Sequence, residues 1–138
     1  MKLLLEIITP EKIAFKDKID EAIVPTVNGE IAILPHHVGL LTQIAPGELI
    51  IKKNNKLQSV AITGGFLEIS NNRISIITNY AVNAESINIA KAEEAKKRAE
   101  HLMQERTTDR DFRIADAELR KAILELKVAY KHGRRATQ

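Results

Sequence analysis

Residues 27–49 read VNGEIAILPHHVGLLTQIAPGEL, and the Asn28-Gly29 pair near the start decides how this part of the chain folds. An Asn-Gly pair between two apolar runs is the strongest short signal for a β-hairpin. The runs here cover residues 22–27 and 31–34, and Pro46-Gly47 marks a second turn. This stretch therefore predicts closely spaced antiparallel strands.

The same pattern covers the first 80 residues or so. Further apolar runs flank Asn54-Asn55 and Asn71-Asn72, pairs that tolerate the positive φ of tight turns. Residues 3–9 and 12–16 add two more expected strands. Many short strands separated by turns are typical of an antiparallel sandwich. A second sheet is needed because a single sheet would leave one face of residues 49–51, Leu-Ile-Ile, uncovered.

After residue 85 the apolar period becomes that of an α-helix. Ser86 is the expected N-cap of a helix that ends near Gln104. Residues 107–109, Thr-Thr-Asp, separate it from a second helix, which we expect Gly133 to end. Apolar residues at steps of three and four predict a narrow seam between the two helices. The expected seam residues are Ala92, Ala95, Ala99, Leu102 and Met103, facing Phe112, Ala115, Leu119, Ala122, Leu126 and Ala129.

The expected fold class is therefore α+β. An N-terminal antiparallel β-sandwich occupies residues 1–84, and a C-terminal antiparallel hairpin of two helices occupies residues 85–138. A buried Leu contributes about 1.5–3 kcal/mol and an Ala much less, so an alanine-rich seam holds the helices weakly. We hypothesise that the hairpin opens without unfolding the sandwich.

Composition excludes several kinds of chemistry. The chain has no cysteine, which rules out disulfides, thiolate catalysis and Cys-ligated zinc. Gly64-Gly65 lacks the spacing and the Lys-Ser/Thr of a phosphate loop. Adjacent His36 and His37 would point to opposite faces of a strand, so we expect no metal site. No apolar run approaches the ~20 residues of a membrane span, so any membrane attachment would come through partner proteins.

Positive charge gathers in the helical half. Residues 1–85 hold 8 basic and 9 acidic side chains, whereas residues 86–138 hold 13 and 9. One interpretation is a solvated helix end, where cations suit the dipole. The other is a docking face for an acidic partner. Nucleic acid is less favoured because Tyr130 is the only aromatic residue after Arg120 available for stacking.

Three segments carry ordered motifs. The first contains Gly29-Glu30, Leu34-Pro35, His37, Leu40-Leu41 and Pro46-Gly47. The others are ITGGFLEISNNRISIIT at residues 62–78 and ADAELRKAILELKVAYK at residues 115–131. In this order the three segments resemble the epsilon subunit family of F-type ATP synthases. Two positions depart from the family pattern, because His36 stands where glycine is usual and Gly39 where proline is usual.

The resemblance implies a non-catalytic subunit of the central stalk of a proton- or sodium-translocating ATP synthase. Its implied partners are the gamma subunit, the membrane c-ring and the catalytic alpha and beta subunits. The sandwich would couple the ring to the catalytic head, and the helices would inhibit ATP hydrolysis. The implied location is peripheral, on the cytoplasmic face of a bacterial plasma membrane or the stromal face of a thylakoid.

The resemblance also implies site residues. The positions that match ring-contacting residues are Glu30 and His37. Candidates for contact with the catalytic beta subunit are Arg110, Arg113, Arg120 and Lys121. The residues that align with an ATP-binding pattern of some bacterial members are Ile87, Asn88, Lys91, Ala92 and Arg98.

Two of these ATP-pattern positions differ from the family. Asn88 replaces an aspartate and Lys91 an arginine, which weakens recognition of base and phosphate. We therefore favour no cofactor over regulatory ATP. The alternative function is a nucleotide-sensing or nucleic-acid-associated module with a basic helical hairpin, which would show salt-dependent retention on nucleic acid.

Overall fold

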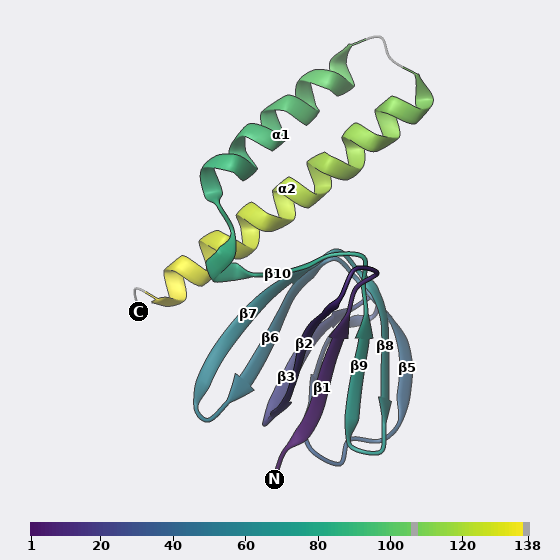
Figure 1. Ribbon diagram of the computed structural model, residues 1–138, viewed down its shortest axis with the longest axis vertical. Helices are drawn as coiled ribbons and strands as arrows, with labels where there is room; N and C mark the ends of the chain where they lie inside the picture. Colours follow the sequence, from purple (N-terminus) through teal and green to yellow (C-terminus); the bar gives the residue numbers. More distant parts are fainter. Residues whose placement is uncertain (106–107, 137–138) are drawn as a thin grey trace. The chain divides into compact units, whose positions relative to one another are not determined.

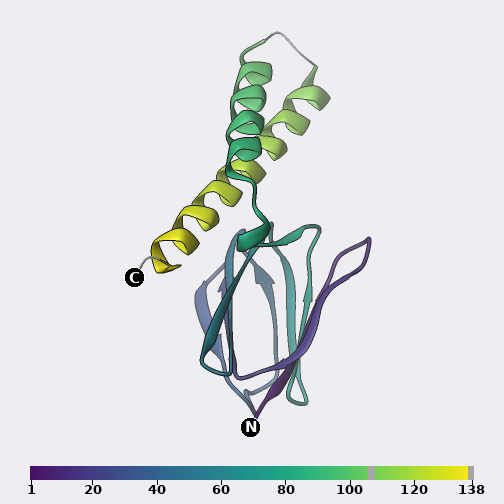
Figure 2. The ribbon, with the colours of Figure 1, turned by 60° about the vertical axis from the view of Figure 1, so that its left-hand side comes forward.

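The computed structural model describes residues 1–105 and 108–136, with side chains as far as Gly133. The chain forms two compact units, one over residues 1–83 and the other beginning at Ala84. Figures 1 and 2 show that the first unit is built of strands and the second of two helices. The α+β fold class expected from the sequence is confirmed.

Ten strands make up the first unit. They are β1 (Leu3–Ile8), β2 (Ile13–Ile19), β3 (Glu21–Thr26), β4 (Gly29–Ile33), β5 (Leu40–Ile44), β6 (Gly47–Lys53), β7 (Lys56–Ile62), β8 (Gly65–Ser70), β9 (Arg73–Ile77) and β10 (Ala81–Asn83). They hydrogen-bond in the order β10-β7-β6-β3-β5-β8-β9-β1-β2, and β4 pairs with β3. All pairs in this unit are antiparallel except β1 with β9, which run parallel.

The asparagine turns follow the sequence prediction. Asn54-Asn55 have φ of 52° and 64°, and Asn71-Asn72 have 52° and 61°, the left-handed conformation that two-residue hairpin loops require. The β3–β4 turn has a different geometry. There φ is positive only at Gly29 (111°), which pairs with Thr26 at the end of the strands. Val27-Asn28 thus form the loop, and Gly29 takes the bulge position that suits glycine.

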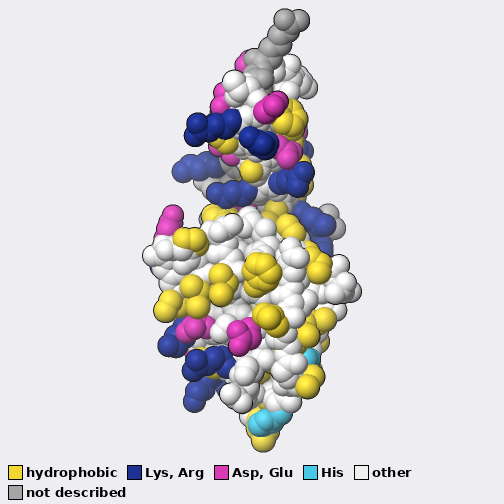
Figure 3. Space-filling model, turned by 90° about the vertical axis from the view of Figure 1, so that its right-hand side faces the viewer, with side chains coloured by type: hydrophobic (Ala, Val, Ile, Leu, Met, Phe, Trp, Pro, Cys, Tyr) yellow, Lys and Arg dark blue, Asp and Glu magenta, His cyan; other side chains and the backbone are white. Residues whose placement is uncertain are grey.

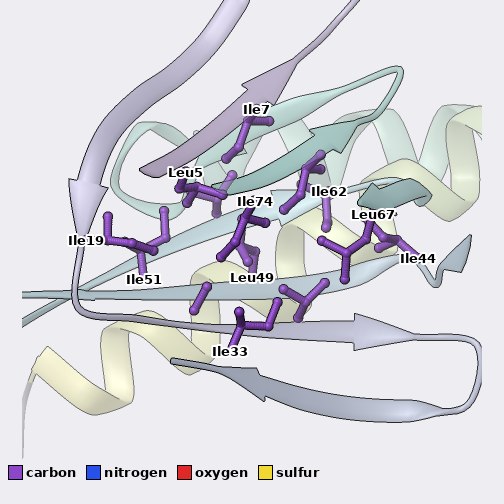
Figure 4. Packing of buried hydrophobic residues seen from close by; sticks show 14 of the residues in the cluster. Leu5, Ile7, Ile19, Ile33, Ile44, Leu49, Ile51, Ile62, Leu67 and Ile74 are labelled. Atoms are coloured by element: carbon purple, nitrogen blue, oxygen red, sulfur yellow. The ribbon is translucent and has the colours of Figure 1, made fainter. Parts of the chain in front are cut away.

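All ten strands belong to one sheet, which curls into two layers (Figures 1 and 2), and the core between these layers is almost entirely aliphatic. Figure 4 shows leucine and isoleucine side chains from both layers pointing toward one another. The largest fully buried side chains are Leu3, Leu5, Ile7, Ile19, Ile33, Ile44, Leu49, Ile51, Ile62, Leu67, Ile74 and Ile76. The backbones of β8 and β9 approach closely where β8 begins, because a Cβ on Gly65 would lie 1.9 Å from the Ile77 carbonyl oxygen. Gly65 has φ of 134°, so glycine is required there on two grounds.

The second unit contains η1 (Ala84–Ser86), α1 (Ile89–Gln104) and α2 (Asp109–Ala136). The prediction that Ser86 caps the first helix is wrong, because Ser86 belongs to the 3₁₀ turn. Asn88 is the N-cap, and its Oδ1 accepts the Lys91 N–H at 3.0 Å. The prediction that Gly133 ends the second helix is also wrong. A glycine caps a helix from the left-handed conformation, and Gly133 continues the helix instead.

The helix seam matches the predicted residues only in part. The buried seam residues are Ala92, Ala99, Ala115, Ala122, Leu126 and Ala129. Leu102 and Phe112, expected in the seam, are both 42% exposed. Leu124 and Val128 are buried although they were not expected to be. Two polar contacts also connect parts of the helical unit. The Tyr130 hydroxyl donates to Glu93 Oε1 at 3.0 Å, and His132 Nε2 lies 3.8 Å from Glu85 Oε1.

A polar corner joins the layers of the sandwich, because Asp20 alone separates β2 from β3. Its N–H donates to the Lys52 carbonyl at 2.8 Å. Its carboxylate accepts from Lys2 Nζ at 2.9 Å and from the Asn54 N–H at 2.8 Å. The Lys2 ammonium, followed by the Asn54 N–H, holds the pKa of Asp20 below its ordinary 3.8.

A second carboxylate on β2 reinforces the corner. Asp17 accepts from Lys53 Nζ and from the Lys18 N–H. These bonds, that of Lys53 first, lower the pKa of Asp17 below 3.8. Because Lys53 lies on β6 and Asp17 on β2, the ion pair links strands that share no ladder hydrogen bond.

The corner predicts how stability depends on pH. A carboxyl group whose pKa is lower in the folded state contributes stability above its unfolded pKa, and this contribution is lost as pH falls through the folded pKa. We therefore expect Asp20→Asn to lower the free energy of unfolding at neutral pH. We also expect it to flatten the loss of stability as pH falls below 3.8. Urea denaturation at a series of pH values measures both effects.

The matched control is Glu11→Gln, which removes an exposed carboxylate from the turn between β1 and β2. It should leave the acid profile close to that of the unaltered chain. Identical profiles for Asp20→Asn and the unaltered chain would contradict a structural role for the corner.

Candidate partner-binding surfaces

The loop between β4 and β5 carries His37 in a defined orientation. The His37 N–H donates to the Leu34 carbonyl at 3.1 Å, which closes a turn. Ring Nδ1 lies 2.7 Å from the Val38 carbonyl oxygen. Because a carbonyl only accepts, Nδ1 must carry the proton, and in the neutral ring Nε2 is then the acceptor. His37 can thus accept a hydrogen bond through Nε2 when neutral and donate one when protonated.

His36 ties this loop to the β8–β9 turn. Its φ is 66°, in the left-handed region, which accounts for glycine being usual at this position of the family pattern. The His36 N–H donates to Asn72 Oδ1 at 2.9 Å, and Asn72 Nδ2 donates to the Lys2 carbonyl at 2.9 Å. His36 therefore adopts a backbone conformation that glycine reaches at lower cost.

An apolar surface surrounds His37. Val38 and Leu41 are 77% and 73% exposed, and Leu34 and Leu40 are also exposed. Figure 3 shows histidine and apolar side chains together at one tip of the sandwich. We call Leu34, His37, Val38, Leu40 and Leu41 the end surface. Exposed apolar side chains gathered near one tip are typical of binding sites.

Glu30 and His37 are not brought together. Glu30 is exposed near the β3–β4 turn, whereas His37 follows the opposite end of β4. Three extended steps from Glu30 to Ile33 alone cover about 10 Å. A partner that touches both residues must therefore extend along β4.

A second apolar surface crosses the outside of the sheet. Phe66 pairs with Ile77, Ile77 with Ile8, and Ile8 with Ile13, so four strands contribute to one row. Phe66, Ile77 and Ile13 are each more than half exposed. Figure 3 shows apolar side chains spread over this side of the sandwich. We call these four residues the side row, and its existence was missed in the sequence because each member lies in a different strand.

Basic side chains form one face of α2. At 3.6 residues per turn, Arg110, Arg113, Arg120 and Lys121 fall within roughly 100° of the helix circumference. The seam residues Ala115, Ala122 and Ala129 fall nearly opposite. The three arginines are exposed and Lys121 is half-buried. Arg120 Nη2 contacts Asp116 Oδ2 at 3.1 Å, an exposed pair within the helix.

The residues aligned with the ATP-binding pattern have mixed environments. Lys91 and Arg98 are exposed and lie seven residues apart on one face of α1. Ala92 is buried in the seam, and the Asn88 oxygen caps the helix. Ile87 is half-buried before the helix begins. Of the pattern residues, only Lys91 and Arg98 therefore present positive charge that a phosphate group could contact.

Apart from the residues of the ATP-binding pattern, the helical unit has a shallow groove of about 210 Å³ between the two helices. It is lined by Leu102, Asp111, Ile114, Ala115 and Glu118. None of these lining residues belongs to the ATP-binding pattern. The carboxylates of Asp111 and Glu118 would repel a phosphate group. Among residues 1–105 and 108–136, no cluster of three or more His, Asp and Glu side chains could hold a metal. Neither α1 nor α2, as far as the structure describes them, offers an apolar stretch of membrane-spanning length.

Comparison with known proteins divides the chain within one residue of the boundary between the two units. Residues 2–84 match the family described as ATP synthase, Delta/Epsilon chain, beta-sandwich domain. Residues 85–129 match its long alpha-helix domain. The ATP synthase epsilon chain of Dehalococcoides mccartyi is 41% identical over 131 residues, covering 94% of each chain. That of Desulforamulus reducens is 38% identical over 125 residues, covering 91% of this chain and 95% of the relative.

Solved structures share the fold at lower identity. A chain of the Euglena gracilis mitochondrial ATP synthase complex, described as OSCP/F1/c-ring, has a TM-score of 0.68 and 20% identity. The match covers 98% of this chain and 81% of that one. A chain of the Tetrahymena thermophila mitochondrial ATP synthase, described as central stalk/c-ring, has a TM-score of 0.64 and 17% identity, covering 94% and 97%.

The fold and its exposed surfaces define a partner-binding protein made of a β-sandwich and a helical hairpin. The family matches and the relatives at about 40% identity make the class specific. The chain belongs to the delta/epsilon chain family of ATP synthases, and it is an accessory subunit rather than a catalytic one.

The conformation of His36 predicts a stabilising substitution. A left-handed conformation costs roughly 1–2 kcal/mol for a residue with a Cβ, and the greater freedom of glycine in the unfolded chain offsets part of this gain. We expect His36→Gly to raise the free energy of unfolding of the sandwich by up to about 1 kcal/mol. Urea denaturation followed by circular dichroism measures the change.

His37→Gly is the matched control, because φ of His37 is not positive. It should lower stability through the added freedom of the unfolded chain. Equal effects of the two substitutions would contradict a strained backbone at His36.

Proposed function

We propose that this chain is the non-catalytic central-stalk subunit of a proton- or sodium-translocating ATP synthase. In this proposal the sandwich binds the gamma subunit and the membrane c-ring and couples them mechanically. The helical hairpin contacts the catalytic beta subunit, within the head of alpha and beta subunits, and inhibits ATP hydrolysis. Attachment to the membrane is peripheral and occurs through these partners, on the cytoplasmic face of the plasma membrane of a bacterium.

The observation that carries the proposal is the presence of two separate apolar surfaces on one rigid sandwich. A coupling subunit needs one surface for each partner, and exposed apolar patches favour protein contacts. The side row crosses four strands and suits an elongated partner, which we assign to the gamma subunit. The end surface is small and lies at a tip, which suits the loops of the c-ring.

Polar residues would give the ring contact its specificity. Because Nδ1 of His37 donates to the Val38 carbonyl, ring Nε2 is left to form a hydrogen bond with a partner beside the apolar side chains of the end surface. Glu30 adds a carboxylate that can pair with basic or polar loop tips of the ring. Since Glu30 lies about 10 Å or more along β4 from His37, the two residues would contact different loops of the ring.

The basic face of α2 supports the inhibitory role. Arg110, Arg113 and Arg120 are exposed and directed away from the alanine seam, so they can contact an acidic partner while the helices stay packed, and Lys121 beside them is half-buried. Each exposed ion pair contributes only about 0.2–1 kcal/mol. Inhibition therefore requires several pairs, and salt should weaken it. ATP binding by Lys91 and Arg98 stays a separate prediction, which titration calorimetry with the full chain can decide.

The two surfaces predict separable losses of binding. Burial of a large apolar side chain contributes about 1.5–3 kcal/mol, or about 10- to 100-fold in Kd. We expect Phe66→Ser or Ile77→Ser to weaken binding to purified gamma subunit by that factor and leave c-ring binding unchanged. Val38→Ser or Leu41→Ser should do the reverse. Leu57→Ser, at an exposed residue outside both surfaces, serves as control.

Each variant can be immobilised on a sensor surface, and its Kd for gamma subunit and for detergent-solubilised c-ring can then be measured. If substitutions in the side row and the end surface weakened both partners equally, the assignment of one surface to each partner would be wrong. If the unaltered chain bound neither partner, the proposed function itself would fail.

The hairpin predicts a brake on hydrolysis. A chain that ends after Asn83 keeps all ten strands, so it should assemble with the stalk and yet leave ATP hydrolysis uninhibited. Combined substitution of Arg110, Arg113 and Arg120 by Ala should relieve part of the inhibition. Raising the salt concentration should relieve inhibition by the unaltered chain in the same way. Hydrolysis by the reconstituted complex is the measurement.

Combined substitution of Lys12, Lys18 and Lys56 by Ala removes the same charge from exposed positions of the sandwich. This control should inhibit as strongly as the unaltered chain. Equal inhibition by the truncated and full-length chains would remove any braking role for the helices.

A further inference from the structure

Asn28 differs chemically from the other asparagines of the chain. It alone is followed by glycine, and both Asn28 and Gly29 are exposed at the β3–β4 turn. The side-chain amide of Asn28 makes no hydrogen bond within the described residues. By contrast, the side-chain oxygens of Asn54, Asn72 and Asn88 accept from Lys2 Nζ, the His36 N–H and the Lys91 N–H.

We propose that Asn28 is a site of spontaneous deamidation. The backbone nitrogen of Gly29 attacks Cγ of Asn28, so an N–Cγ bond forms and the Cγ–Nδ2 bond breaks. The proton lost from the Gly29 nitrogen leaves with the amide group as ammonia, and a five-membered succinimide remains. Water then opens the ring at one of its two carbonyl groups and yields aspartate or isoaspartate. The net change replaces NH₂ by OH and needs no oxidant or catalyst.

The turn geometry favours this reaction at Asn28. Succinimide formation brings the next residue's nitrogen onto the side chain, and a Cβ on that residue hinders the approach. Gly29 has no Cβ, and nothing lies within 4 Å of the place where one would be. Its φ of 111° belongs to the region open mainly to glycine. The site thus combines an unengaged amide, an unhindered nucleophile and open space for the ring.

The product alters the turn that positions Glu30. The turn depends on short local bonds, since Thr26 Oγ1 donates to the Gly29 carbonyl at 2.5 Å and accepts the Asn28 N–H at 3.2 Å. Isoaspartate routes the main chain through the side-chain carbon and adds one atom to the loop. The Thr26–Gly29 pair, which ends the β3–β4 ladder, can then no longer keep its register. Either product also adds a carboxylate two residues before Glu30.

The test is peptide mass mapping of the purified full-length chain after warm incubation at mildly alkaline pH. We expect the mass gain of an NH₂-to-OH exchange at Asn28 several-fold faster than at Asn54, Asn55, Asn71 or Asn72. Fragmentation that cleaves within the isoaspartate backbone should identify that isomer in the product. Asn28→Gln is the matched control, because its amide is one carbon too distant for the five-membered ring, and it should stay intact.

Retention of the Asn28 amide, or conversion no faster than at Asn71 and Asn72, would overturn the proposal. The measurement uses the chain alone, so its outcome does not depend on whether the stalk and ring contacts are correct. Hydrogen exchange of the incubated chain adds a second readout, with loss of protection expected in β3 and β4. Unchanged protection in a sample shown to contain isoaspartate would contradict the structural consequence.

Discussion

The fold depends on how the chain turns from one layer of the sandwich into the other at Asp20. A sandwich with one residue between β2 and β3 has no loop to absorb the change of direction, so the corner must be fixed by bonds. Asp20 supplies them with its backbone N–H and both carboxylate oxygens. The Asp17–Lys53 ion pair adds a contact between β2 and β6. Once the two layers are held face to face, their alternating leucine and isoleucine side chains can form one continuous core.

Local chemistry explains which parts of the fold could be predicted from sequence. The asparagine pairs at 54–55 and 71–72 fix their turns by themselves, so the adjoining strands were expected within one or two residues. β5 was missed because Leu40-Leu41 breaks the alternation, and its single buried side chain is Ile44. β10 has three residues and exists only through its ladder with β7. The parallel pairing of β1 with β9 is likewise a long-range choice that no local signal encodes.

The functional surfaces were predictable to a smaller extent, for a related reason. The resemblance to the epsilon family named His37 and the basic residues of α2 as candidates, but it could not show that Val38 and Leu41 are exposed near His37 in the chain. The side row could not be predicted from the sequence either, because its four residues become neighbours only through the pairing of four strands. Helix positions are simpler: the 3.6-residue period alone sets Arg110, Arg113 and Arg120 opposite the alanine seam. The sequence gives the residue types of a surface, but which side chains are exposed depends on tertiary packing.

The two units differ in the side chains that hold them together, and this difference suits the proposed combination of coupling and regulation. Twelve of the largest fully buried side chains are leucine or isoleucine of the sandwich, each contributing about 1.5–3 kcal/mol. Five of the six buried seam positions between α1 and α2 are alanine, and the polar contacts of Tyr130 and His132 are partly exposed. This contrast supports the hypothesis that the helices can separate without unfolding of the sandwich. Arg110, Arg113 and Arg120 are exposed on the side of α2 away from the seam, so a partner can contact these arginines while the helices stay packed.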